Sequence, residues 1–263
     1  MDHSLHFLWN AQGTTGALVG SYNGPLVVLS ILLSVMSSYI ALELAGKLAA
    51  AGNFAGRGLW LWVGAMVMGC GIWAMHFVGM MAFELPVPIT YRLDITLISV
   101  LPGILASYLA LVLISQPRLG LGGILLGGVL FGAGIGAMHY IGMFAMLTSA
   151  DMVYRIDLFL LSVVAAVILA ILALLVRGWL QNLHLSKNSV VGAFLGAAFM
   201  GAAIASMHYI AMKATIYLPG DSLAVHGGLS METLSLLTAT ISIMIGLAVV
   251  IVAELDPDKH ATV

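Results

Sequence analysis

The stretch AMHYIGM, at residues 137–143, lies inside apolar sequence and occurs in two further versions. Residues 74–80 read AMHFVGM, and residues 206–212 read SMHYIAM. Each version holds one histidine, which a methionine follows four residues later. An ionisable side chain inside a membrane is costly to bury and indicates a functional site. Three such copies in matching surroundings predict both a repeated fold and one shared site.

The composition is that of a membrane protein. Of the 263 residues, 62% are hydrophobic and 8% are charged, whereas soluble domains carry roughly 25% charged residues. The mean hydropathy is +1.11. The net charge of −2 gives no electrostatic basis for nucleic-acid binding, and a single cysteine cannot form an internal disulfide. The first 23 residues contain no lysine, no arginine and no apolar core, so no cleavable signal peptide is expected.

Seven apolar runs are long enough to cross a bilayer, which takes about 20 helical residues. We place them at 24–46, 59–83, 94–115, 120–147, 157–177, 190–214 and 233–254. The connections on one side of these runs hold six lysine and arginine residues, and those on the other side hold three. The more basic side is expected in the cytoplasm, which places the N-terminus outside and the C-terminus inside. The expected fold is an all-α membrane protein with seven transmembrane helices.

The repeat extends beyond the three phrases. Their histidines are separated by 63 and 69 residues, and the sequence YRLD at 91–94 recurs as YRID at 154–157. The first six spans are therefore expected to form three helical hairpins, with the histidines at one depth near the outer face. The seventh span lies outside this repeat. We divide the chain into an outer segment (1–23), a repeat domain (24–215), an outer connection (216–232), the last span (233–254) and a cytoplasmic tail (255–263).

The residue types in each phrase favour a metal site. The histidine and the methionine four residues later share one helix face, and the residue just before that methionine is glycine or alanine. Imidazole combined with thioether suits copper, three imidazoles also suit zinc, and histidine or methionine also ligates haem iron. Methionine is equally at home as apolar packing. The predicted ligands are His76, His139, His208, Met80, Met143 and Met212.

Several other residues are weaker candidates. The methionine before each histidine is a further candidate ligand, Glu84 continues the spacing of four from the first phrase, and two aspartates open later spans. Those aspartates are expected to cap helices, with an outer-shell role toward a histidine as the alternative. These candidates are Met75, Met138, Met207, Glu84, Asp94 and Asp157. His3 and the terminal amine offer nitrogen donors for Cu(II), and a plain N-terminal tail is the simpler interpretation.

At these phrases the sequence resembles the MHYT family of bacterial integral-membrane sensor domains, over roughly residues 24–215. The threonine of the family signature is replaced by Val78, Ile141 and Ile210, and Phe77 replaces its tyrosine in the first copy. The resemblance implies six repeat spans, phrases near the periplasmic face, and a copper site that senses oxygen, carbon monoxide or nitric oxide. It also implies cytoplasmic domains of GGDEF or EAL type, which make or break cyclic di-GMP. The ligands it implies are Met75, His76, Met80, Met138, His139, Met143, Met207, His208 and Met212.

Two classes of function follow. The first is a sensor in the bacterial inner membrane, not itself an enzyme, which signals to an output domain in cis or to a partner in trans. A homodimer is a further expectation. The second class is a copper carrier or oxidoreductase that uses the same site. A carrier needs a polar path inward from the histidines, and the middles of the even-numbered spans offer almost none, which favours the sensor. A retinal protein is excluded because the last span, 233–254, contains no lysine.

Overall fold

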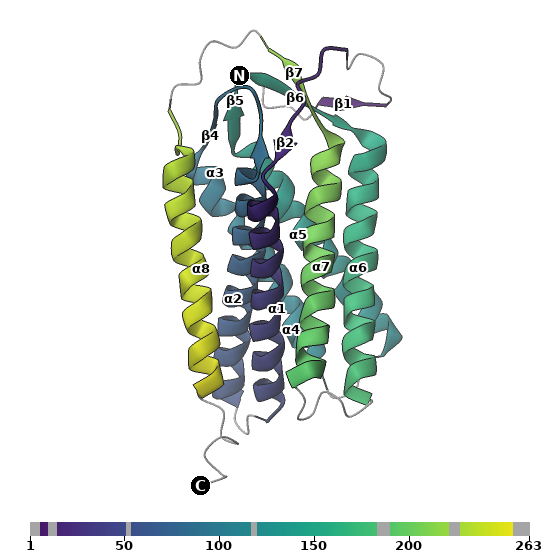
Figure 1. The fold of residues 1–263 in the computed structure, drawn as a ribbon. Helices are drawn as coiled ribbons and strands as arrows, with labels where there is room; N and C mark the ends of the chain where they lie inside the picture. Colours follow the sequence, from purple (N-terminus) through teal and green to yellow (C-terminus); the bar gives the residue numbers. More distant parts are fainter. Residues whose placement is uncertain are drawn as a thin grey trace.

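The computed structural model describes residues 6–9, 15–50, 54–116, 120–182, 190–220 and 227–254. Long helices run side by side, and short strands gather at one end of the bundle (Figure 1). The helices are α1 (Gly24–Ala50), α2 (Phe54–Met81), α3 (Leu93–Ile98), α4 (Val100–Ile114), α5 (Leu121–Phe144), α6 (Ile156–Asn182), α7 (Val190–Ala214) and α8 (Met231–Glu254). The strands are β1 (His6–Leu8), β2 (Ser21–Tyr22), β3 (Phe83–Glu84), β4 (Ile89–Tyr91), β5 (Met146–Thr148), β6 (Ala150–Arg155) and β7 (Thr215–Pro219).

Six membrane spans predicted from the sequence are confirmed by length and composition, within the described residues. The third span is divided at Ser99 into α3 and α4, just before Pro102, which cannot donate the backbone hydrogen bond that a continuous helix needs there. The seventh predicted span coincides with α8, whose described apolar part, Met231–Ile245, is shorter than the other six. Its crossing of the bilayer stays a prediction, as does the orientation of the whole bundle.

The six spans form a ring with approximate threefold repetition. Helices α2, α5 and α7 carry the three phrases and contact one another pairwise. Each of the helices α1, α4 and α6 packs against two of these three, so inner and outer helices alternate around the ring. Helix α8 lies against α2 and α1, on the outside of the ring (Figure 1).

Glycines seven residues before each histidine let neighbouring repeats approach closely. A Cβ atom on Gly69 would lie 2.6 Å from Ile104 Cα, and one on Gly132 would lie 2.7 Å from Val167 Cα. In the third repeat a Cβ atom on Gly201 would lie 2.7 Å from the Cα of Val35, in the first repeat. Small residues permit such close helix contacts in membranes. The three crossings therefore lock each inner helix to the outer helix of the next repeat.

Each repeat is closed by a strand pair that the all-α prediction missed. The antiparallel pairs are β2 with β3, β4 with β5, and β6 with β7. In each pair the strand before the hairpin faces the strand after it, and the register is equivalent: Tyr22 faces Phe83, Tyr91 faces Met146, and Tyr154 faces Thr215. Strand β1 adds to β6 in parallel. These pairs satisfy backbone groups where the chain leaves the helices, and they cover the end of the bundle nearest the histidines.

Candidate metal site

The three phrase histidines meet on the axis of the inner helices. His76, His139 and His208 are fully buried, and their Nδ1 atoms lie 3.1, 3.1 and 3.2 Å apart. In the described residues this is the one group of three or more histidine, cysteine, aspartate or glutamate side chains close enough to hold a metal ion. A point equidistant from three nitrogens at this spacing lies about 1.8 Å from each, near the roughly 2.0–2.1 Å of a metal–imidazole bond.

Neutral imidazoles cannot satisfy one another in this triangle. Each neutral ring carries one N–H and one lone pair, and the tautomer follows from the surroundings. If one ring carries its proton on Nδ1, the lone pairs of the other two Nδ1 atoms face each other and repel. If a second ring also carries its proton on Nδ1, the two N–H groups repel each other. All three Nε2 atoms are also buried without a hydrogen-bond partner. A cation at the centre removes this conflict, because every Nδ1 lone pair then points at positive charge.

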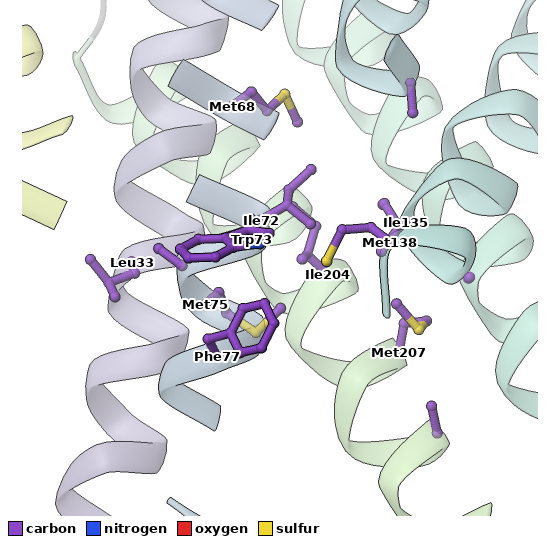
Figure 2. Packing of buried hydrophobic residues seen from close by; sticks show 14 of the residues in the cluster. Leu33, Met68, Ile72, Trp73, Met75, Phe77, Ile135, Met138, Ile204 and Met207 are labelled. Carbon is purple, nitrogen blue, oxygen red and sulfur yellow. The ribbon is translucent and has the colours of Figure 1, made fainter. Parts of the chain in front are cut away.

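The triangle is one of four layers in the core of the inner helices. A layer of isoleucines, Ile72, Ile135 and Ile204, lies four residues before the histidines, and all three are buried. Figure 2 shows these isoleucines in one part of the core, coming from three different helices. One turn further from the strands, the same face carries Met68, Phe131 and Met200, which are also buried. The histidine triangle is thus sealed by apolar side chains on the side away from the strands.

The predicted methionine ligands are all buried in the same core. The methionines four residues after the histidines form the layer on the strand side, with Met80 at 0%, Met143 at 0% and Met212 at 4% exposure. The methionines before the histidines are equally buried, and they are Met75, Met138 and Met207. Figure 2 shows that these three lie among the isoleucines and aromatic rings of the core. Their role as ligands stays a prediction, and packing accounts for their burial.

The acidic candidates do not join the histidines. Glu84 falls in strand β3, where it faces Ser21 across the pair and is exposed, because α2 ends at Met81 and the spacing of four ends with it. Asp94 and Asp157 form exposed ion pairs with Arg92 and Arg155 and lie in the first turns of α3 and α6. The histidine Nε2 atoms have no hydrogen-bond partner, and the outer-shell role of these aspartates stays a prediction. His3 lies outside the described residues.

The residue after each histidine joins two repeats. The Tyr140 hydroxyl lies 2.6 Å from Ser162 Oγ in the next repeat, and the Tyr209 hydroxyl lies 2.8 Å from Ser30 Oγ. Where Phe77 replaces tyrosine, Trp73 donates its Nε1–H to the equivalent Ser99 Oγ at 3.1 Å. These serines are 69 and 63 residues apart, a spacing close to that of the histidines, although they lie outside the three phrases. Every histidine is therefore flanked by a polar link between repeats.

A tyrosine from the strand end packs on each of these links. The ring of Tyr91 lies 5.6 Å from Phe77, that of Tyr154 lies 5.9 Å from Tyr140, and Tyr22 lies 5.8 Å from Tyr209, between centroids. Burial, with a smaller contribution from Tyr209, raises the pKa of the Tyr22 hydroxyl to about 12. Burial also raises the pKa of Tyr91, so these hydroxyls remain protonated at neutral pH. Tyr22 and Tyr91, which pack on the links, are thus uncharged.

Comparison with known proteins identifies the repeat. The family model MHYT, described as a bacterial signalling protein N terminal repeat, matches residues 69–127, 132–193 and 201–262. The first two matches each contain the second half of an inner helix and the outer helix that follows it. The third contains the second half of α7 and all of α8, so the third family match includes α8. Each match contains one of the three phrases.

Several signalling proteins are similar to this chain. The bifunctional diguanylate cyclase/cyclic di-GMP phosphodiesterase MucR of Pseudomonas aeruginosa is 39% identical over 93% of this chain and 35% of its own length. The cyclic di-GMP phosphodiesterase NbdA of the same organism is 36% identical over 74% of the chain and 25% of its own length. The signaling protein YkoW of Bacillus subtilis is 33% identical over 75% of the chain and 24% of its own length. The chain thus spans about a third of the length of MucR and about a quarter of the length of the other two relatives. No solved structure matches it.

Proposed function

This chain belongs to the MHYT family of bacterial signalling proteins, and we propose that it is a membrane sensor module that holds one copper ion through three histidine Nδ1 atoms. The observation that carries the proposal is the buried triangle of Nδ1 atoms, with sides of 3.1–3.2 Å. Hydrogen bonds among three neutral rings cannot satisfy all three Nδ1 atoms at this spacing, whereas a cation at the centre accepts all three lone pairs. We place the module in the bacterial inner membrane, with the strand end outside.

Charge and ligand softness favour Cu(I) over Zn²⁺. The ligand group contains three neutral imidazoles and no carboxylate within the described residues, so the full charge of the ion stays in an apolar core. Burying an uncompensated charge is costly, and this cost is smaller for a monovalent ion. The methionine layer on the strand side supplies soft sulfur, which Cu(I) accepts and hard cations do not. Haem fits poorly, because the converging histidines leave no room for a porphyrin ring between them.

The sensed signal would be a diatomic gas (oxygen, carbon monoxide or nitric oxide) or the metal or redox state of the site. Three ligands leave a coordination position open, as in three-ligand metal sites that accept a small molecule. The open side faces the methionine layer and the strand end, because the isoleucine layer closes the other side. A copper carrier or oxidoreductase is the alternative function. Two buried apolar layers argue against a carrier, because they offer an ion no polar side chain on the way inward from the histidines. They are the isoleucine layer and the layer of Met68, Phe131 and Met200.

Metal selectivity tests this proposal. Purified protein given equal amounts of Cu(I) and Zn²⁺ under reducing conditions is expected to retain Cu(I). Replacing Met143 by leucine is expected to weaken Cu(I) binding by about tenfold and leave Zn²⁺ affinity unchanged, because only Cu(I) gains from the thioether. Met36→Leu, on the exposed side of α1, is the matched control. Retention of zinc in place of copper by the wild-type protein would overturn the choice of metal.

Helix α8 is the proposed output element, leading from the repeat domain toward a cytoplasmic domain. Just before α8, Leu229 exchanges two backbone hydrogen bonds with Tyr91, at 3.1 and 2.6 Å. The Tyr91 ring contacts Phe77, which adjoins His76 in sequence. A change at His76 therefore has a short route to α8. The relatives' names report synthesis and breakdown of cyclic di-GMP, and we extend that output to this protein.

Replacing Leu229 by proline is expected to uncouple α8 from the site. Proline has no backbone N–H, so the 2.6 Å hydrogen bond to the Tyr91 carbonyl is lost, while the histidines are untouched. With a diguanylate cyclase fused after residue 263, we expect copper-dependent cyclic di-GMP production in the wild type and in Leu229→Ala. In Leu229→Pro we expect unchanged copper content and loss of the copper response. A full response in the proline variant would exclude this route.

A further inference from the structure

The outward-facing nitrogens of two histidines lie against glycines of neighbouring repeats. A Cβ atom on Gly79 would lie 2.5 Å from His208 Nε2, and one on Gly142 would lie closer still to His76 Nε2. Real Cβ atoms essentially never lie this close to another heavy atom, so a residue larger than glycine would require the imidazole to move. Both Nε2 atoms are buried and have no hydrogen-bond partner. Each glycine therefore faces the back of an imidazole whose Nδ1 atom belongs to the triangle.

The contacts follow a cyclic order around the threefold axis. Gly79 and Gly142 occupy the same position, three residues after the histidine of their own phrase. The glycine of the first repeat faces the histidine of the third repeat, and the glycine of the second repeat faces the histidine of the first. We call the space that each glycine leaves for the imidazole a seat. In the third phrase this position is held by Ala211, which is fully buried. Neither glycine faces the histidine of its own repeat.

We propose that Gly79 and Gly142 are positioning residues, which hold the rings of His208 and His76 with Nδ1 toward the axis and so define the metal-binding nitrogen. This inference rests on the proposed metal site. A metal bound through Nδ1 leaves the proton of the neutral ring on Nε2, and the glycine seat accommodates that atom without a Cβ atom in its path. Because each seat comes from another repeat, the three ligands align only when all three repeats are closed around the axis.

A methyl group on either seat must displace the imidazole. The ring moves mainly by rotation about its side-chain bonds, and a rotation that frees Nε2 swings Nδ1 out of the triangle. Metal–imidazole bonds of roughly 2.0–2.1 Å leave little tolerance for such a shift. Gly79→Ala is therefore expected to reduce the number of imidazole ligands from three to two. Ala211→Gly, at the equivalent position, removes a methyl group and is expected to keep three.

The experiment has two arms, both on the chain of residues 1–263. In the first, X-ray absorption spectroscopy of the Cu(I)-loaded protein counts imidazole nitrogens in the wild type, Gly79→Ala and Ala211→Gly. Counts of three, two and three support the proposal, and a count of three in Gly79→Ala overturns it. If Gly79 were needed only for the packing of its helix, Gly79→Ala would not remove one particular imidazole ligand from the copper ion.

The second arm measures thermal unfolding of the metal-free protein in a double-mutant cycle. Gly79→Ala is expected to lower Tm when His208 is present and to have no effect in a His208→Ala background, because the colliding ring is gone. If Gly79→Ala fails to fold, recovery of folding by His208→Ala supports the proposal. Equal losses in both backgrounds, or failure of the double variant to fold, overturn it. If the wild-type protein binds no metal, the proposed function is wrong. The unfolding measurements need no metal, so they still decide whether Gly79 leaves the space for the His208 ring.

Discussion

Replacing His139 by alanine is expected to lower copper affinity by more than about 100-fold, beyond the 10–100-fold that loss of an outer partner of a ligand costs. Two imidazoles remain, and in the described residues no carboxylate or thiol is near enough to take the third position. Equilibrium titration with a Cu(I) chelator of known affinity measures the change. The same loss is expected for His76→Ala and His208→Ala, because the three rings occupy equivalent positions.

The control for this prediction is His6→Ala. His6 lies in strand β1 and is exposed, so copper affinity is expected to stay at the wild-type value. Circular dichroism of each variant confirms that the helices persist. Full copper binding by folded His139→Ala protein would contradict a site made from all three repeats.

Replacing Gly132 by leucine is expected to prevent the bundle from folding. A Cβ atom at this position already lies 2.7 Å from the backbone nitrogen and Cα of Val167 in α6, and backbone cannot turn aside as a side chain can. Overpacking of flexible core sites costs about 1–3 kcal/mol, and separation of two helix backbones adds the loss of their shared contacts. Yield of monodisperse protein in detergent and Tm are the measurements.

A matched pair on the same helix isolates the cause. Gly132→Ala is expected to lower Tm, because even one methyl group meets the α6 backbone. Gly136→Ala places the same methyl group in open space and replaces glycine by a better helix former, so Tm is expected to stay equal or rise, since glycine costs about 1 kcal/mol relative to alanine in a helix. Equal effects of the two changes would contradict the close crossing of α5 and α6.

Much of this architecture is predictable from the sequence because it is repeated. Three phrases at matching positions predict three hairpins and histidines at one depth, and the structure brings those histidines together. The strand pairs are not predictable in this way, because strands such as β3, with two residues, are too short to show an alternating pattern. The same limit explains the error at Glu84, whose helical spacing from His76 holds only if the helix continues past Met81.

Side-chain rotation sets a second limit. The sequence places His139 on the inner face of a helix, but nothing in the residue order distinguishes Nδ1 from Nε2 as the nitrogen that faces the axis. For His208 and His76, we propose that this choice depends on Gly79 and Gly142, each of which belongs to a different repeat from the histidine that it faces. The serines that pair with Tyr140 and Tyr209 were within reach of sequence reasoning, because their spacing follows the same repeat.

X-ray absorption spectroscopy of the purified wild-type protein, loaded with Cu(I), shows whether the three histidines bind one copper ion together. We expect one copper ion per chain, bound by three imidazole nitrogens at about 2.0 Å, the range of metal–imidazole bonds, with or without an additional sulfur. A protein that retains no copper, or a copper ion with fewer than three imidazole ligands, would contradict this expectation.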